Sequence, residues 1–298
     1  MRKVSWLLMA ALMLTVGLVA MACMDDEEEA IPLVAVGAAD YSFTAPDSIA
    51  GGIVRVAMTN NGKEDHHVAM LRLNPGVTQQ QFRTTLADTL KAAATEGEAA
   101  FGRLFAVVTP AGGSGGAAPG KQDEMVLDLK QGEHVMVCFL PGPDGVPHIA
   151  KGMVKAINVT APAAEQPSPP AVKGTVELAD FAFTSLPEIG AGKTTVQVVN
   201  KGKEPHEMIL LRPKGVTVAQ LQQILTSPPP PPGSAAPPAG PPPFEAAGGF
   251  FGVEPGGRGW ATLNLTAGEY LMVCFFPSPA NQGKPHLALG MIRPLTVK

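Results

Sequence analysis

The chain has 298 residues, enough for two domains of ordinary size, and a formal net charge of −4 at pH 7. Only 16% of its residues are charged, and the acidic ones outnumber the basic ones. A mildly acidic chain that is poor in lysine and arginine lacks the basic surface that nucleic acids require, so we expect no nucleic-acid partner.

Residues 1–22 are typical of an export signal. Arg2 and Lys3 form a positive start, an apolar run follows, and small residues lead directly into Cys23. This order is similar to a bacterial lipoprotein box, which predicts cleavage before Cys23 and attachment of a lipid to it. Residues 23–30 are then an acidic tether. The alternative is an uncleaved membrane anchor, and both interpretations predict an extracytoplasmic, membrane-anchored protein, periplasmic or on the outer cell surface.

The rest of the chain repeats itself. Residues 40–44 (DYSFT) match residues 180–184 (DFAFT), and further matches follow at similar spacing. The repeat predicts two domains, residues 31–160 and 173–298, joined by a proline-rich linker over residues 161–172. Each domain is long enough to bury a core of its own, and we expect the linker to keep the two apart.

Short β-rich segments punctuated by glycine turns run through both halves. Residues 53–59 and 194–199 are rich in β-branched side chains, and apolar and polar residues alternate over 125–129 and 261–265. Strands of this length between glycine-rich turns predict an all-β fold of two tandem Greek-key β-sandwich domains.

One short helical insertion is predicted in each half. Both helices begin with a capping box, formed by Thr78 with Gln81 and by Thr217 with Gln220. The second helix must end before the prolines that start at Pro228. Residues 227–249 are rich in Pro, Ala and Gly, so we predict a loop there, with residues 112–120 as its shorter counterpart in the first half.

Each half carries two histidines, one cysteine and one methionine in the same order and in matching local sequence. These residues are His66, Cys138, His148 and Met153 in the first half, and His206, Cys274, His286 and Met291 in the second. Taken singly, such residues often only pack a core. Together, two imidazoles, a thiolate and a thioether form a soft donor set that suits copper, with the methionine as a long axial ligand. We therefore expect up to two coppers, one per domain.

On these residues the chain resembles the cupredoxins, the family of plastocyanin and azurin. The resemblance implies that His66 and His206 are the first imidazole ligands and that the loop after each cysteine supplies the second imidazole and the methionine. The His-x4-Met spacing agrees with plastocyanin. The loops themselves depart from the family, because nine residues separate Cys138 from His148, and eleven separate Cys274 from His286.

The resemblance implies a blue-copper electron carrier that exchanges electrons with redox partner proteins. Copper oxidases of related fold need additional histidines, but no His-x-His pair occurs and only His67 and His134 remain outside the two sets. Their counterparts are Glu207 and Tyr270, so we expect both to be surface or near-site polar residues. The chain is therefore expected not to be an enzyme. The alternative is a copper carrier or partner-binding module without redox activity, which would exchange copper with donor or acceptor proteins.

Overall fold

The computed structural model describes residues 30–227 and 242–298. The predicted export signal, Cys23 and nearly all of the acidic tether lie outside the described residues. Within the described ranges, no helix is both long enough and apolar enough to cross a membrane.

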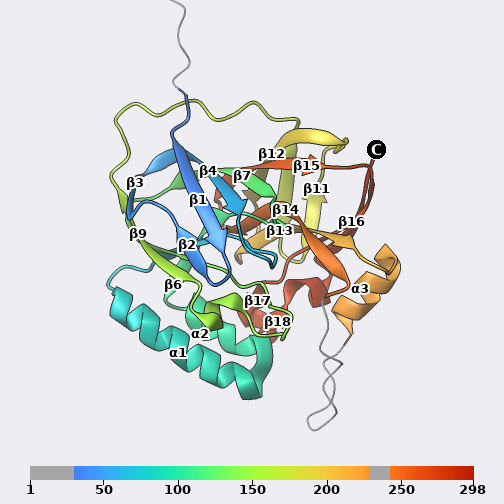
Figure 1. Ribbon diagram of the computed structural model, residues 1–298, viewed down its shortest axis with the longest axis horizontal. Helices are drawn as coiled ribbons and strands as arrows, with labels where there is room; N and C mark the ends of the chain where they lie inside the picture. The colour runs from blue at the N-terminus through green and yellow to red at the C-terminus, as the bar shows by residue number, and fades with distance from the viewer. Residues whose placement is uncertain (1–29, 228–241) are drawn as a thin grey trace, which may run out of the picture.

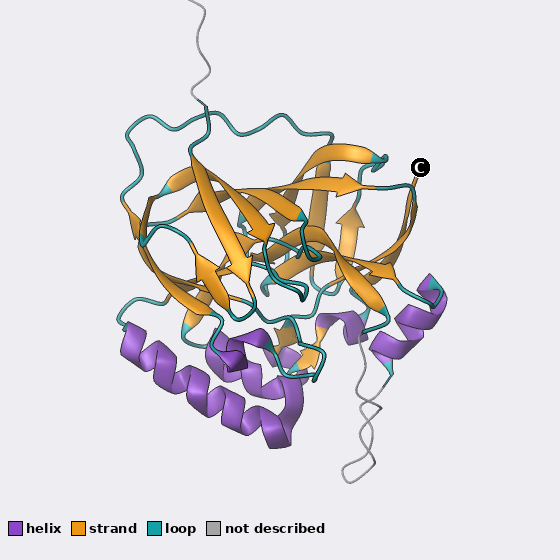
Figure 2. Ribbon diagram, viewed as in Figure 1, coloured by secondary structure: helices purple, strands orange, loops and turns teal. Residues whose placement is uncertain are grey.

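Two large β-sheets form the body of the molecule (Figures 1 and 2). The eight-stranded sheet contains β1 (Leu33–Ala39), β2 (Ser42–Thr44), β4 (Gly52–Asn60), β7 (Gln122–Leu129), β10 (Thr175–Ala179), β11 (Ala182–Ser185), β12 (Gly192–Asn200) and β15 (Arg258–Leu265). The nine-stranded sheet contains β3 (Ser48–Ala50), β5 (Ala69–Leu73), β6 (Val108–Gly113), β8 (Gly132–Val137), β9 (Val154–Thr160), β13 (His206–Pro213), β14 (Phe244–Val253), β16 (Gly268–Val273) and β19 (Ile292–Val297). The predicted all-β sandwich architecture is confirmed.

The strands form where apolar and polar residues alternate along the sequence. In β4 the side chains of Val54, Val56 and Met58 are buried, while the residues between them are partly exposed. β4 pairs parallel with β1 and antiparallel with β7, so its inward face lies in the middle of the first half's core. β12 and β15 repeat the antiparallel pairing in the second half.

The two halves are joined through both sheets. β7 pairs antiparallel with β15, and Val253 of β14 pairs with Ala111 of β6. One hydrophobic core then contains buried residues from both halves. The expectation that the linker keeps the halves apart is therefore wrong, because each half has an unpaired strand edge that the other half covers. The domain boundaries remain a prediction.

The helices lie along one edge of the sandwich, as Figure 2 shows. α1 (Gln79–Glu96) and α3 (Val218–Thr226) both begin with the predicted capping boxes. α1 is longer than expected for a short insertion, and η1 (Gly97–Phe101) and α2 (Gly102–Phe105) follow it directly. Phe82 and Leu104 bury the inner face of this helical group against the sandwich.

The predicted loops are partly strands. Residues 244–249 belong to β14, which pairs with β13 over most of its length, and β6 extends to Gly113. The sequence does not indicate these strands because they are rich in glycine, which favours a loop. The glycines are required because neighbouring backbone lies too close for a side chain. A Cβ at Gly249 would lie 2.1 Å from the Met208 carbonyl oxygen, and one at Gly113 would lie 2.0 Å from that of Val68. Residues 228–241 of the longer loop lie outside the described residues.

Candidate metal centre

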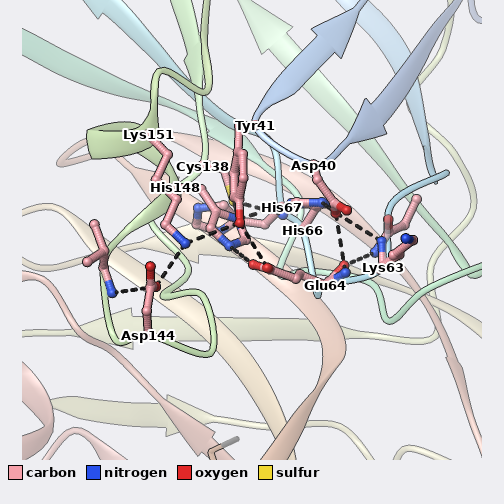
Figure 3. Close-up of polar contacts among 12 residues, drawn as sticks. Asp40, Tyr41, Lys63, Glu64, His66, His67, Cys138, Asp144, His148 and Lys151 are labelled. Carbon is pink, nitrogen blue, oxygen red and sulfur yellow. Dashed lines mark hydrogen bonds and ion pairs between the residues drawn. The ribbon is translucent and has the colours of Figure 1, made fainter. Parts of the chain in front are cut away.

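Three side chains from distant elements meet in the first half. His66 lies between β4 and β5 and bridges Ala117, Cys138 directly follows β8, and His148 begins η2 (His148–Lys151). All three side chains are buried, and their donor atoms lie within 4.8 Å of one another. Figure 3 shows the imidazoles and the thiol turned toward a common point.

The second half repeats the arrangement. His206 begins β13, Cys274 directly follows β16, and His286 begins η4 (His286–Leu289). These side chains are equally buried and again place their donor atoms within 4.8 Å of one another. The structure thus brings together six of the eight predicted ligands as two equivalent clusters.

In both clusters, the same ring nitrogens face each other. The Nδ1 atoms of His66 and His148 are 3.1 Å apart, and Sγ of Cys138 is 3.5 Å from Nδ1 of His148. In the second cluster, the corresponding distances are 3.0 Å between the two Nδ1 atoms and 3.4 Å from Cys274 Sγ to His286 Nδ1. Two nitrogens and one sulfur are therefore close enough to share one small ion.

A carboxylate holds the outer nitrogen of each imidazole. Nε2 of His66 lies 3.0 Å from Oδ1 of Asp40, and Nε2 of His148 lies 2.7 Å from Oε2 of Glu64 (Figure 3). Because a carboxylate accepts, Nε2 carries the hydrogen and Nδ1 of a neutral ring is left with a lone pair. This is the carboxylate–histidine pairing that orients metal-binding imidazoles in proteins.

The carboxylate pairing recurs in the second half, where burial also favours the neutral form of both imidazole rings. His206 Nε2 lies 3.0 Å from Asp180, and His286 Nε2 lies 2.9 Å from Glu204. Burial lowers the pKa of His206 and also lowers the pKa of His286, so both rings are neutral at pH 7. Two lone pairs then face each other at 3.0 Å with no hydrogen between them, an arrangement that a cation would stabilise.

The thiols are protonated as long as no cation is bound. Burial raises the pKa of Cys138 to about 12, and it raises the pKa of Cys274 well above its ordinary value. The backbone N–H of His67 points at the Cys138 sulfur, at 3.5 Å. A metal ion at this point would displace the thiol proton, and the amide hydrogen bond would help to stabilise the thiolate that results.

Both predicted axial methionines are buried beside their cysteines. The Cys138 amide donates to the Met153 carbonyl at 3.3 Å, and the Met153 amide donates to that of His148 at 3.0 Å. The same two bonds, at 3.1 and 2.9 Å, tie Met291 to Cys274 and to the second histidine of that half. These backbone hydrogen bonds place each methionine next to its cysteine, and the role of the two methionines as axial ligands stays a prediction.

The long segment between each cysteine and the following histidine returns to the cluster through a small hairpin. His148 N donates to Leu140 O at 2.9 Å, and Pro141 bridges Pro147, so the residues between them form a small hairpin that leaves and returns at one point. In the second half, the strands β17 (Pro277–Ser278) and β18 (Lys284–Pro285) form the same excursion. The added length is placed outside the cluster and does not displace the histidine.

The two remaining histidines differ from their prediction as surface residues. His67 is 4% exposed and its Nε2 accepts the Phe139 amide at 2.7 Å; Glu207 holds the Phe275 amide in the same way at 2.7 Å. His67 is thus a near-site residue, as the alternative prediction had it. His134 is fully buried in β8, with Nδ1 donating to the Gly132 carbonyl at 3.0 Å. The counterparts of both histidines also form hydrogen bonds, Glu207 with the Phe275 amide and Tyr270 with the Thr266 carbonyl.

The sequence reasoning missed the carboxylates and the aromatic residue beside them. Tyr41 donates to Glu64 at 2.9 Å and places its ring edge-on to His148, with 5.4 Å between ring centroids. Its φ of 66° is strained for a bulky residue, and Phe181 repeats this with φ of 64°. The signal was available, since the repeated 40–44 segment contains both the aspartate and the aromatic residue, and Glu64 and Glu204 also recur.

The chain was compared with known proteins. No protein-family model matches it, and no curated protein matches it by sequence. Among solved structures, it is similar to auracyanin A, a "blue" copper protein from Chloroflexus aurantiacus, at 16% identity and a TM-score of 0.30, covering 44% of this chain and 100% of that one. It is also similar to a copper nitrite reductase from Nitrosomonas europaea, at 14% identity and a TM-score of 0.25, covering 90% of this chain and 94% of that one. A multicopper oxidase matches at 14% identity and a TM-score of 0.23, covering 89% of this chain and 88% of that one.

The last two of these proteins are enzymes. The prediction that the chain is not an enzyme is contradicted by them and is withdrawn. The two buried His–Cys–His clusters could each hold a metal ion, and their soft nitrogen and sulfur donors suit copper.

Proposed function

We propose that the chain is an exported, membrane-tethered protein that binds copper and carries electrons, with one type 1-like site in each half. The observation that carries the proposal is the meeting of two imidazole lone pairs and a thiol at one buried point, twice. The proposed ligands are His66, Cys138, His148 and Met153 in one site, and His206, Cys274, His286 and Met291 in the other.

The donor chemistry fits copper better than magnesium or calcium. Magnesium and calcium prefer oxygen ligands, whereas a thiolate, two imidazoles and a thioether suit Cu(I) and Cu(II). Bound copper would supply one-electron chemistry. The protein's own part is to fix the imidazoles through Asp40 and Glu64, to hold the thiolate through an amide hydrogen bond, and to exclude water by burying every donor.

The cellular placement is part of the same proposal. A lipid on Cys23 and the acidic tether that follows would hold the sandwich outside the cytoplasm, where redox partner proteins could reach it. The second candidate is a copper carrier or partner-binding module without redox activity, which uses the same eight residues to hold copper for donor and acceptor proteins.

Adding Cu(II) to the purified chain that begins at residue 30 tests the proposal. We expect an intense visible thiolate-to-copper band, and up to two coppers per chain by mass spectrometry. Cys138→Ser should remove about half of both signals, and Cys274→Ser the other half. If copper binds but the solution stays pale, with the electron paramagnetic resonance of ordinary square-planar copper, the electron-carrier proposal fails and the copper-carrier candidate remains.

A further inference from the structure

A cavity of about 300 Å³ lies between the two candidate metal centres, with walls from both halves. Phe139 and Phe275, which directly follow the two cysteines, both line it. Its volume is at the lower end of the range of small-molecule pockets in proteins. Most of the wall is apolar, and it includes side chains from the helical group after α1 as well as from β14.

Aromatic rings dominate the apolar wall. The ring of Phe251 stacks on Phe139 with 5.8 Å between centroids and lies 5.4 Å from Phe276. Phe105 of α2 lies 4.9 Å from Phe276 and 6.0 Å from Phe139, so these four rings form one connected set. Such a surface favours a flat ring, because offset and edge-on contacts add to the gain from burying apolar area.

Two polar side chains interrupt this wall. His67 is 4% exposed and Glu207 is 3% exposed, and both line the cavity. Nε2 of His67 accepts the Phe139 amide, so the neutral ring carries its hydrogen on Nδ1. Within residues 30–227 and 242–298, neither His67 Nδ1 nor the second carboxyl oxygen of Glu207 has a hydrogen-bond partner. Both residues line the cavity, so these two polar atoms are available to a ligand bound in it.

We propose that this cavity binds a small uncharged phenol. The ring would lie among the phenylalanines, and its hydroxyl oxygen would accept from Nδ1 of His67, while the hydroxyl hydrogen would be donated to the carboxyl group of Glu207. An ion would lose its hydration against apolar walls, and a pure hydrocarbon would leave both polar side chains without partners. The site does not depend on bound copper, since neither His67 nor Glu207 is among the proposed ligands.

A pair of matched probes tests the proposal without altering the protein. Binding of 2-naphthol and of naphthalene to the metal-free chain is measured by equilibrium dialysis at pH 7. We expect 2-naphthol to bind about tenfold more tightly, because only its hydroxyl group can form hydrogen bonds with His67 and Glu207. Equal affinity for the two probes, or no binding of 2-naphthol, would overturn the proposal.

Two alanine variants then locate the bound probe. Ala246 lines the cavity in β14, whereas Ala156 is exposed in β9. Ala246→Phe should reduce 2-naphthol affinity at least tenfold and Ala156→Phe should not, with circular dichroism confirming that both variants fold. Binding that survives Ala246→Phe places the probe elsewhere. Because no copper is present, neither outcome affects the proposed copper sites.

Discussion

Replacing Glu64 should weaken copper binding in the first half and leave the second half unchanged. Oε2 of Glu64 accepts from His148 at 2.7 Å, Oε1 accepts from Tyr41, and the side chain is 19% exposed. Glu64→Gln keeps an acceptor but loses the charge. Hydrogen bonds to charged groups contribute about 1.5–3 kcal/mol and neutral ones about 0.5–1.5 kcal/mol, so the loss is about 1–1.5 kcal/mol, or roughly five- to tenfold in affinity. Glu64→Ala removes the partner altogether and should cost about 10- to 100-fold.

The assay is a competition titration against a copper chelator in a Cys274→Ser background, so that only the first site contributes. Asp47→Asn is the matched control, because Asp47 also forms an ion pair but its side chain is 92% exposed and binds only Lys155. An affinity ranking of wild type, then Glu64→Gln, then Glu64→Ala supports the orienting role. If Glu64→Ala binds copper as tightly as wild type, the carboxylate does not position His148 and the reasoning is refuted.

Three further outcomes are expected. Burial lowers the pKa of His134 to about 4, so the free energy of unfolding should fall by about 3 kcal/mol as the pH falls from about 6.5 to 4. His134→Tyr introduces the residue found at the equivalent position 270 and should flatten this part of the pH profile, measured by urea unfolding. Thr78→Ala removes the side-chain acceptor for the Gln81 amide and should cost about 1 kcal/mol, seen as faster hydrogen exchange of that amide; unchanged exchange would show that the cap is redundant. Because β7 and β15 pair across the halves, the intact chain should unfold in one thermal transition and residues 31–160 alone should be poorly soluble, whereas a stable isolated half would contradict the shared core.

Local features could be predicted from the sequence. Capping boxes at Thr78 and Thr217 involve residues three apart, and the alternation of β4 reports directly which side chains face inward. The His, Cys and Met positions were equally accessible, because each lies in a short segment that recurs in both halves. Motifs that lie within one short segment can be recognised in the sequence without knowing which distant segments they contact.

Features that depend on distant contacts could not be predicted. Nothing in β7 or β15 alone shows that their edges pair with each other, since the alternation of side chains reports which face is buried and does not identify the strand that pairs with the backbone edge. The strand at residues 244–249 was missed for a related reason. Its glycines are required by the close approach of β13, and their composition favours a loop when that neighbour is unknown.

The carboxylate partners occupy an intermediate position. Asp40 and Glu64 recur as Asp180 and Glu204, so the repeat itself marked them. Their function was hidden because acidic residues next to turns are usually solvated, and only the structure shows that each one reaches a buried imidazole.

The complete burial of His148, together with the hairpin between Pro141 and Pro147, has a kinetic consequence. Because the donors of the first centre are buried, an ion could enter or leave only when part of the surrounding structure opens, and the frequency of that opening would then limit ion exchange. If the centre holds copper as proposed, slow opening would retain the ion through periods when the surrounding fluid contains almost none, and the loading of the protein would reflect past supply more than present supply.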